Sequence, residues 1–212
     1  MQALFIGIIG LFNFFSPAPA TQTTYVSPLA GFSAEWNNQV YAECNTAETA
    51  NYMTADEKEL IHILNLARKN PTLFASTVVA KFPSFSGDNS LGGNSYFKSL
   101  MATLQQTNPL PILRPNEVLF KSAFCHAETS GKSGYVGHDR QTAACEKSEK
   151  YFGECCDYGH NKPLDIIMAL LIDKDVPSLG HRKICLGSYA TIGVSIQPHK
   201  TYRFTSVLDL GY

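Results

Sequence analysis

Several features that would assign a chain to a functional class are missing from this sequence of 212 residues. Lys and Arg together number 17, Asp and Glu number 18, and the net charge is −1. Because no long basic run occurs either, there is no electrostatic reason to expect nucleic acid or an acidic membrane surface as the partner. Charged residues make up only 17% of the chain and hydrophobic residues 44%, which excludes disorder by composition and provides for a core.

Short motifs for common site types are missing too. No two cysteines are separated by two residues, and the adjacent pair Cys155-Cys156 is poor spacing for a zinc finger. Residues 131–133 (GKS) lack the glycine five positions earlier that a phosphate-binding loop requires. No serine lies in a nucleophile elbow in the region between Ser130 and Gly137. The local sequence therefore predicts neither a nucleotide site nor a serine hydrolase.

The N-terminal apolar run is too short to cross a membrane. It extends from Leu4 to Phe15, whereas a membrane-spanning helix needs about 20 apolar residues. Residues 16–20 (SPAPA) follow, and this pattern is typical of a secretory signal cleaved after Ala20. We therefore expect residues 1–20 to be a signal peptide, and the mature protein to be secreted, extracellular and without a transmembrane anchor.

The cysteines fit that compartment. Their number is even, six, and an even number behind a signal peptide predicts oxidation to three disulfides. Fifteen connectivities are possible for six cysteines, and the spacing does not choose among them. The candidate disulfide residues are Cys44, Cys125, Cys145, Cys155, Cys156 and Cys185.

Residues 21–53 are polar and rich in turns, which indicates an N-terminal arm. Trp36 and Tyr41 predict that part of the arm packs on the body of the protein. A capping box at residues 54–57 (TADE) then predicts a helix that runs to about Lys69. Length argues for a single domain, which we place at residues 54–212.

Helices dominate the middle of the chain and strands its end. The pattern predicts helices over residues 96–106, 115–130 (with Gly131 as the stop) and 164–173. Apolar and polar residues alternate over 190–197, and residues 202–210 follow a turn, which predicts a hairpin with one buried face. This order of elements predicts an α+β fold with an antiparallel sheet that helices cover.

Three residues that can perform chemistry stand beside glycines, where elements are expected to begin or end: His138, Glu154 and His181. We expect the fold to gather them in one cleft. His126 faces the core on the helix over 115–130, and we expect it to be a hydrogen-bonded core residue or one that supports the site.

Three further residues are expected to have no part in the site. We expect His62 to be a solvated or capping histidine, His199 to be solvent-exposed on a hairpin turn, and Arg182 to form an ion pair.

Several stretches, taken in order, resemble the CAP superfamily, which contains cysteine-rich secretory proteins, insect venom antigens and plant pathogenesis-related proteins. The resemblance spans about residues 54–212 and is closest to the microbial branch. Jointly the stretches are specific, although each alone would be weak. They are residues 66–75 (LARKNPTLFA), 119–137, 153–154 (GE), 170–182 (LLIDKDVPSLGHR), 192–194 (IGV) and 208–211 (LDLG).

The resemblance implies a three-layer α-β-α sandwich whose cleft gathers two histidines and two acids. The first histidine matches His138, the first acid Glu154, and the second histidine His181. The second acid has no clean match, and the nearest candidates are Asp173 and Asp175. Cys155 stands where the family motif has asparagine, which suggests a disulfide from Cys155 to Cys185 or Cys145 beside the site.

The implied chemistry is divalent-metal binding, because imidazoles and carboxylates are zinc ligands. A metal-held water could attack a peptide bond, which would make the protein a metal-dependent extracellular protease. The sequence presents no convincing base or nucleophile for turnover, so we expect a non-enzymatic binding or effector protein instead. The resemblance implies a sterol or fatty acyl ligand, or an extracellular protein partner.

Overall fold

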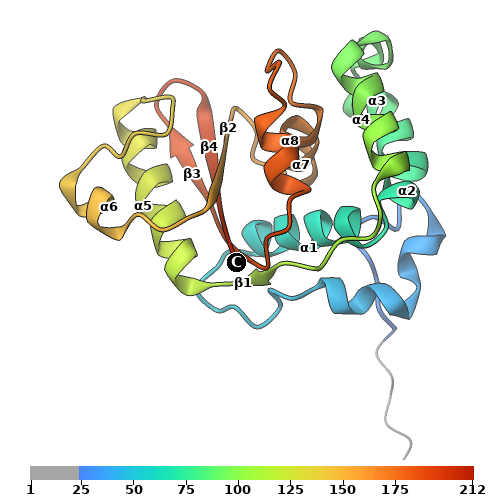
Figure 1. Cartoon of the computed structure of the whole chain (residues 1–212), viewed down its shortest axis with the longest axis horizontal. Coiled ribbons are helices and arrows are strands. Elements are labelled where there is room, and N and C mark those ends of the chain that lie inside the picture. The colour runs from blue at the N-terminus through green and yellow to red at the C-terminus, as the bar shows by residue number, and fades with distance from the viewer. Residues whose placement is uncertain (1–23) are drawn as a thin grey trace, which may run out of the picture.

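The structure, a computed structural model, describes residues 24–212 and shows an α+β protein (Figure 1). The predicted signal peptide, residues 1–20, lies outside the described residues. The α-helices are α1 (Ala55–Lys69), α2 (Pro71–Leu73), α3 (Ala80–Ser86), α4 (Ser95–Gln106), α5 (Glu117–Ser133), α6 (Ala143–Ser148), α7 (Pro163–Ile172) and α8 (Gly180–Cys185). The strands are β1 (Arg114–Pro115), β2 (Gly153–Tyr158), β3 (Thr191–His199) and β4 (Arg203–Gly211).

The four strands form one sheet in the order β1-β3-β4-β2. Strands β3 and β4 form the predicted hairpin, and β2 pairs antiparallel with the far side of β4. Only the short β1 is parallel to its neighbour, β3. The sheet is therefore mainly antiparallel, as predicted, and β2 lies at its edge.

The predicted start of α1 is confirmed in atomic detail. The Thr54 hydroxyl accepts the Glu57 backbone N–H, and a Glu57 carboxylate oxygen accepts the Thr54 backbone N–H, which completes the capping box. The other oxygen of Glu57 accepts the backbone N–H of Ile196 in β3. One capping residue thus also joins the helix to the sheet.

The predicted stop of α5 at Gly131 is wrong. The helix continues to Ser133, and Gly134, whose φ is +81°, caps it in the left-handed conformation. Gly131 has another purpose, because a Cβ there would lie 2.2 Å from the carbonyl oxygen of Pro198. The glycine therefore permits close approach of α5 to the end of β3.

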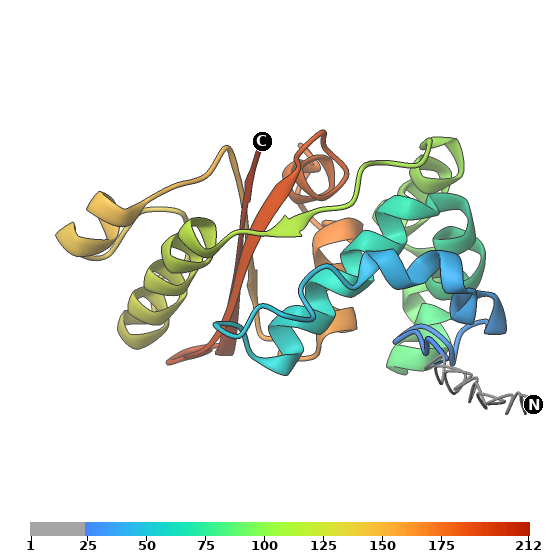
Figure 2. The same ribbon diagram turned by 90° about the horizontal axis from the view of Figure 1, so that it is seen from below.

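The sheet has two different faces, and helices cover both. Figure 2 shows α5 on one side of the strands, with α1 and α7 on the other. The face toward α1 and α7 is apolar and fully buried; it carries Ile192, Val194, Leu208 and Leu210. The face toward α5 is mostly polar, although it is buried as well; it carries Glu154, Cys156, Ser195, Thr205, Val207 and Asp209.

The N-terminal arm contributes to the core, as its aromatic residues predicted. Leu29, Phe32 and Trp36 are buried in the same apolar cluster as α1. The Trp36 indole N–H donates to the Thr77 hydroxyl over 3.0 Å, in the π-helical turn Phe74–Val79. The arm therefore packs against the body through both apolar and polar contacts.

Candidate functional site

Strand β2 organises the candidate site. Successive side chains of a strand point to opposite faces, so Glu154 and Cys156 lie on the side of α5, whereas Cys155 lies on the side of α8. Because β2 is the edge strand, side chains from both of its faces lie close to the open edge of the sheet. The predicted site residues are arranged around this strand as two separate histidine–acid pairs.

The first pair is His138 and Glu154. The His138 Nδ1–H donates to the Glu154 Oε1 over 2.7 Å, with the carboxylate buried and the imidazole side chain 55% exposed. The hydrogen bond to Glu154 raises the pKa of His138. Burial works to raise the pKa of Glu154, but the His138 hydrogen bond and the Arg140 charge together lower it. The pair is therefore an ionised carboxylate that orients an accessible imidazole.

Arg140 and Asp209 complete the surroundings of Glu154, and the sequence analysis missed both. Arg140 Nη1 forms a buried ion pair with Glu154 Oε2 over 2.7 Å, and its Nη2 lies 3.8 Å from Asp209 Oδ2. Asp209 lies directly opposite Glu154 across the β2–β4 pairing. A usable signal was present for Asp209, because it interrupts the apolar run Val207-Leu208 and Leu210 near the end of a predicted strand.

Two carboxyl groups thus meet in the sheet next to one arginine. Burial and the neighbouring Glu154 charge raise the pKa of Asp209 to about 9. At neutral pH Asp209 is therefore a neutral acid, and Glu154 carries the charge that Arg140 balances.

The second pair is His181 and Asp173. His181 is the second residue of α8, and its Nδ1–H donates to the Asp173 Oδ1 over 2.8 Å. The other oxygen of Asp173 accepts the backbone N–H of His181 over 3.0 Å. Asp173 is buried and caps α7 in the left-handed conformation, whereas Asp175 is exposed. Of the two candidates for the second acid, Asp173 is the one that the structure brings to a site histidine.

Both pairs share one geometry. In each, the Nδ1 nitrogen donates to a carboxylate, which leaves Nε2 as the nitrogen with a free lone pair. Carboxylates orient metal-binding histidines in this way, so the donor chemistry of His138 and His181 fits a divalent metal. The two histidines have different carboxylate partners and reach β2 from different sides.

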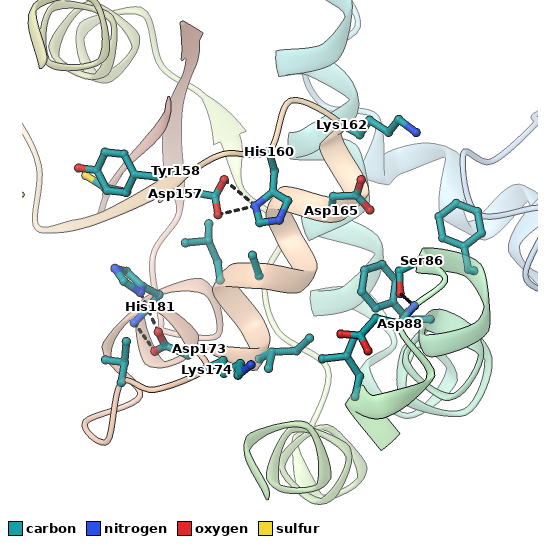
Figure 3. Close-up of a pocket in the computed structure, with 18 residues that line it drawn as sticks. Ser86, Asp88, Asp157, Tyr158, His160, Lys162, Asp165, Asp173, Lys174 and His181 are labelled. Carbon is teal, nitrogen blue, oxygen red and sulfur yellow. Dashed lines mark hydrogen bonds and ion pairs between the residues drawn. The ribbon is translucent and has the colours of Figure 1, made fainter. Parts of the chain in front are cut away.

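A pocket of about 860 Å³ lies beside the edge of the sheet (Figure 3). Its polar wall holds Asp157, His160, Asp173 and His181, and the His160 Nδ1 pairs with the Asp157 carboxylate at 3.0 Å. The remaining wall is partly apolar and comes from α3, α7 and the loops that follow them: Phe82, Phe85, Leu91, Ala169, Leu170, Ile172 and Val176. Among residues 24–212, the lining includes His181 but neither His138 nor Glu154.

His126 lies at the α5 side of β2. It is fully buried, and its Nε2–H donates to the Gly137 carbonyl oxygen over 3.0 Å. Burial lowers the pKa of His126, which keeps the ring neutral. Donor atoms of His126, Glu154 and Cys156 all lie within 4.8 Å of one another, and this buried group could hold a metal ion.

The cysteines differ from the prediction of three disulfides. One disulfide is present, between Cys125 of α5 and Cys145 of α6. Cys145 is therefore not the partner of Cys155. The predicted count is wrong for this structure, because the remaining four cysteines are free and buried: Cys44, Cys155, Cys156 and Cys185. Three of them lie in the main apolar cluster, and Cys156 lies in a smaller one.

Three residues that the sequence placed outside the site are buried instead of exposed or ion-paired. His199 is 4% exposed, and its Nε2 donates to the Tyr135 carbonyl oxygen. His62 is buried against Tyr25, whose hydroxyl lies 2.8 Å from its Nε2. Arg182 donates to the Leu171, Ile172 and Tyr96 carbonyl oxygens and to the Ser99 hydroxyl, and so fastens α8 to α4 and α7. The position of each depends on contacts distant in sequence.

Comparisons with protein-family models, with curated proteins and with solved structures found no match. Within residues 24–212, no helix has the length and apolar character that crossing a membrane requires.

Proposed function

We propose that this chain is an extracellular CAP-like binding protein with the three-layer α-β-α arrangement, and that it holds an amphiphilic small molecule without converting it. The observation that carries the proposal is the 860 Å³ pocket beside β2. This volume falls within the range of about 300–1,000 Å³ that small-molecule sites occupy in proteins.

The lining of the pocket favours a sterol or a fatty acyl chain. Phe82, Phe85 and Val176 supply apolar surface for the hydrocarbon body of such a ligand. His160 and His181, each paired with an aspartate, supply polar groups for a hydroxyl or carboxylate head. A ligand with one polar end and a long apolar body satisfies both walls, because it leaves no buried polar group without a partner.

Binding without turnover is favoured by the state of the thiols beside the pocket. Burial raises the pKa of Cys155 and Cys156 well above the ordinary value, so both remain protonated at neutral pH. A protonated, buried thiol is a poor nucleophile. His138, His160 and His181 are each hydrogen-bonded to a carboxylate, and among the described residues no histidine ring is paired with a serine hydroxyl.

The test is to fill the pocket. Ala169 lines it, and Ala169→Trp places an indole where the ligand body is proposed to lie. We expect the Kd for a fluorescent sterol or a fluorescent fatty acid to rise at least about tenfold, equivalent to about 1.4 kcal/mol. Ala144→Trp, on the exposed surface of α6, is the matched control and should leave the Kd unchanged. Equal binding by both variants, or no binding by the wild type, contradicts the proposal.

The second candidate function is a metal-dependent hydrolase, and the carboxylate-oriented histidines favour it. Bound through the Nε2 atoms of His138 and His181, a zinc ion would supply an activated water. Glu154 and Asp173 would hold the two rings in orientation. Peptide cleavage that is lost both on chelation and in His138→Ala would establish this function over ligand carriage. If the protein binds an extracellular protein and shows neither ligand binding nor peptide cleavage, both of these proposed functions are wrong.

A further inference from the structure

The polar layer between α5 and the sheet contains buried groups without partners. Within residues 24–212, His126 Nδ1, Arg140 Nε and both carboxyl oxygens of Asp209 have no hydrogen-bond partner, although none is accessible to bulk water. Leaving a buried polar atom unsatisfied costs about 1–3 kcal/mol, so a cluster of them needs an explanation. Their three residues all lie next to Glu154.

The His126 ring, whose Nδ1 has no hydrogen-bond partner among the described residues, lies close to two other side chains that can bind a metal, Glu154 and Cys156. Because its Nε2–H donates to Gly137, Nδ1 is the unprotonated nitrogen of a neutral ring. A ring nitrogen of His126, a Glu154 carboxylate oxygen and the Cys156 sulfur lie within 4.8 Å of one another, and Nδ1 is the ring nitrogen that is free to bind a metal. All three side chains are buried, which separates this group from the exposed acidic clusters that are common without a metal.

We propose that a zinc-type transition-metal ion binds between α5 and β2 through His126 Nδ1, Cys156 Sγ and a Glu154 carboxylate oxygen. His138 becomes a fourth donor when its proton moves from Nδ1 to Nε2, because Nδ1 lies 2.7 Å from Glu154 Oε1 and 3.8 Å from Cys156 Sγ. This site goes beyond the proposed ligand pocket and differs from a site shared by His138 and His181. It uses the α5 face of β2 and does not include His181.

The donor set selects the class of metal. Nitrogen, thiolate sulfur and one carboxylate suit Zn²⁺ or Co²⁺, whereas Mg²⁺ and Ca²⁺ require oxygen ligands. The Cys156 thiol, protonated in the metal-free protein, releases its proton when the metal binds, and the resulting thiolate and ionised Glu154 supply two negative charges that match a divalent cation. At zinc–ligand bond lengths the donor atoms stand about 3.5 Å apart, so a group whose donor atoms lie within 4.8 Å of one another contracts by no more than about 1.3 Å.

The second-sphere groups suit this placement. Arg140 pairs with Glu154 Oε2 at 2.7 Å, while Oε1 faces His138 and remains on the side of the other donors. The Gly137 carbonyl oxygen holds the far nitrogen of His126, an arrangement that fixes ring orientation in known metal sites. Cys156 also borders the large pocket, which gives an ion a route from solvent.

The experiment is titration of Co²⁺ into the metal-free secreted form, followed by its thiolate-to-cobalt charge-transfer absorption. We expect saturable binding at one equivalent with this absorption, and Zn²⁺ should displace the cobalt. Cys156→Ser should abolish the absorption, and His126→Gln should weaken binding at least about 100-fold. Cys44→Ser is the matched control, because Cys44 is another buried free cysteine in a different cluster, and it should behave as the wild type.

His181→Gln separates this site from one that His138 and His181 would share. Unchanged cobalt absorption and affinity in this variant support the α5-side site, and their loss overturns it. Absence of saturable binding in the wild type, or persistence of the thiolate absorption in Cys156→Ser, overturns the proposal too. Circular dichroism shows whether each variant is folded. If a variant does not fold, the presence or absence of saturable cobalt binding with thiolate absorption in the wild type still tests the proposal. If no metal binds but the protein still binds a sterol, the metal proposal is wrong and the proposed ligand-binding function is retained.

Discussion

Both faces of the central sheet are buried, but they differ in the side chains that they bury. Toward α1 and α7, Ile192, Val194 and Leu208 are excluded from water among other apolar side chains. Toward α5, Glu154, Asp209 and Thr205 are excluded from water as well, and several of their polar atoms have no partner. Apolar burial stabilises the first face, whereas the second holds costly groups that suit a binding site. The difference indicates that the apolar face contributes most to stability, whereas the α5 face carries the buried polar groups that the proposed metal site would use.

The largest effect should come from breaking the contact between α5 and the polar face. Gly193 lies so near the helix that a Cβ there would stand 2.0 Å from the Phe120 backbone nitrogen. Gly193→Ala must therefore displace α5, and we expect a loss of more than about 4 kcal/mol in the free energy of unfolding, or failure to fold. Urea denaturation measures it. Gly92→Ala, with no atom near its added Cβ, should change stability by less than about 0.5 kcal/mol.

Next comes the charge pair on that face. Glu154→Gln leaves the buried Arg140 guanidinium without its carboxylate, and removing one partner of a buried pair costs about 3–5 kcal/mol. Glu117→Gln breaks an exposed pair with Lys121 and should cost about 0.5 kcal/mol or less. Chemical denaturation of the two variants gives the comparison directly. Equal losses would show that the polar face is solvated in solution, against the structure.

A similar but smaller loss is expected on the apolar face. Leu208 is fully buried, and Leu208→Ala should destabilise the protein by about 3 kcal/mol through lost burial and the cavity left behind. The exposed Val40, truncated to alanine, is the control and should have almost no effect. Denaturation curves should shift in midpoint with an unchanged slope. A negligible loss at Leu208 would remove the contrast between the two faces.

The smallest predicted effect concerns a titratable group on the apolar side. Burial lowers the pKa of His62, on α1, from the ordinary 6.5 to about 4. The unfolded chain therefore binds more protons than the folded chain between these two values, and stability falls as the pH drops through that window. We expect a loss of about 2 kcal/mol between pH 7 and pH 5 from this residue. His62→Gln should flatten that part of the pH profile, and an unchanged profile would show that His62 is solvated.

Local sequence patterns were sufficient to predict the longest helices, α1, α4, α5 and α7, and the β3–β4 hairpin. The capping box at Thr54 predicted the start of α1, and alternation predicted the β3–β4 hairpin, because both patterns depend only on neighbouring residues. The pairing of Glu154 with His138 agrees with the expectation that distant residues gather at one site. The sequence feature that pointed to His138 and Glu154 was their position beside a glycine where an element was expected to begin or end.

The sequence by itself determined the α+β class, the order of the elements and the candidate chemistry of His138, Glu154 and His181, since periodicity and residue type are local properties. Only the tertiary structure decided that Asp173 rather than Asp175 contacts His181, and that Arg140 and Asp209 surround Glu154. It also decided that His126 and Cys156 face the same carboxylate across α5 and β2. The physical reason is that these contacts depend on strand register and on how closely α5 approaches the sheet, and neither is encoded in any single stretch of the chain.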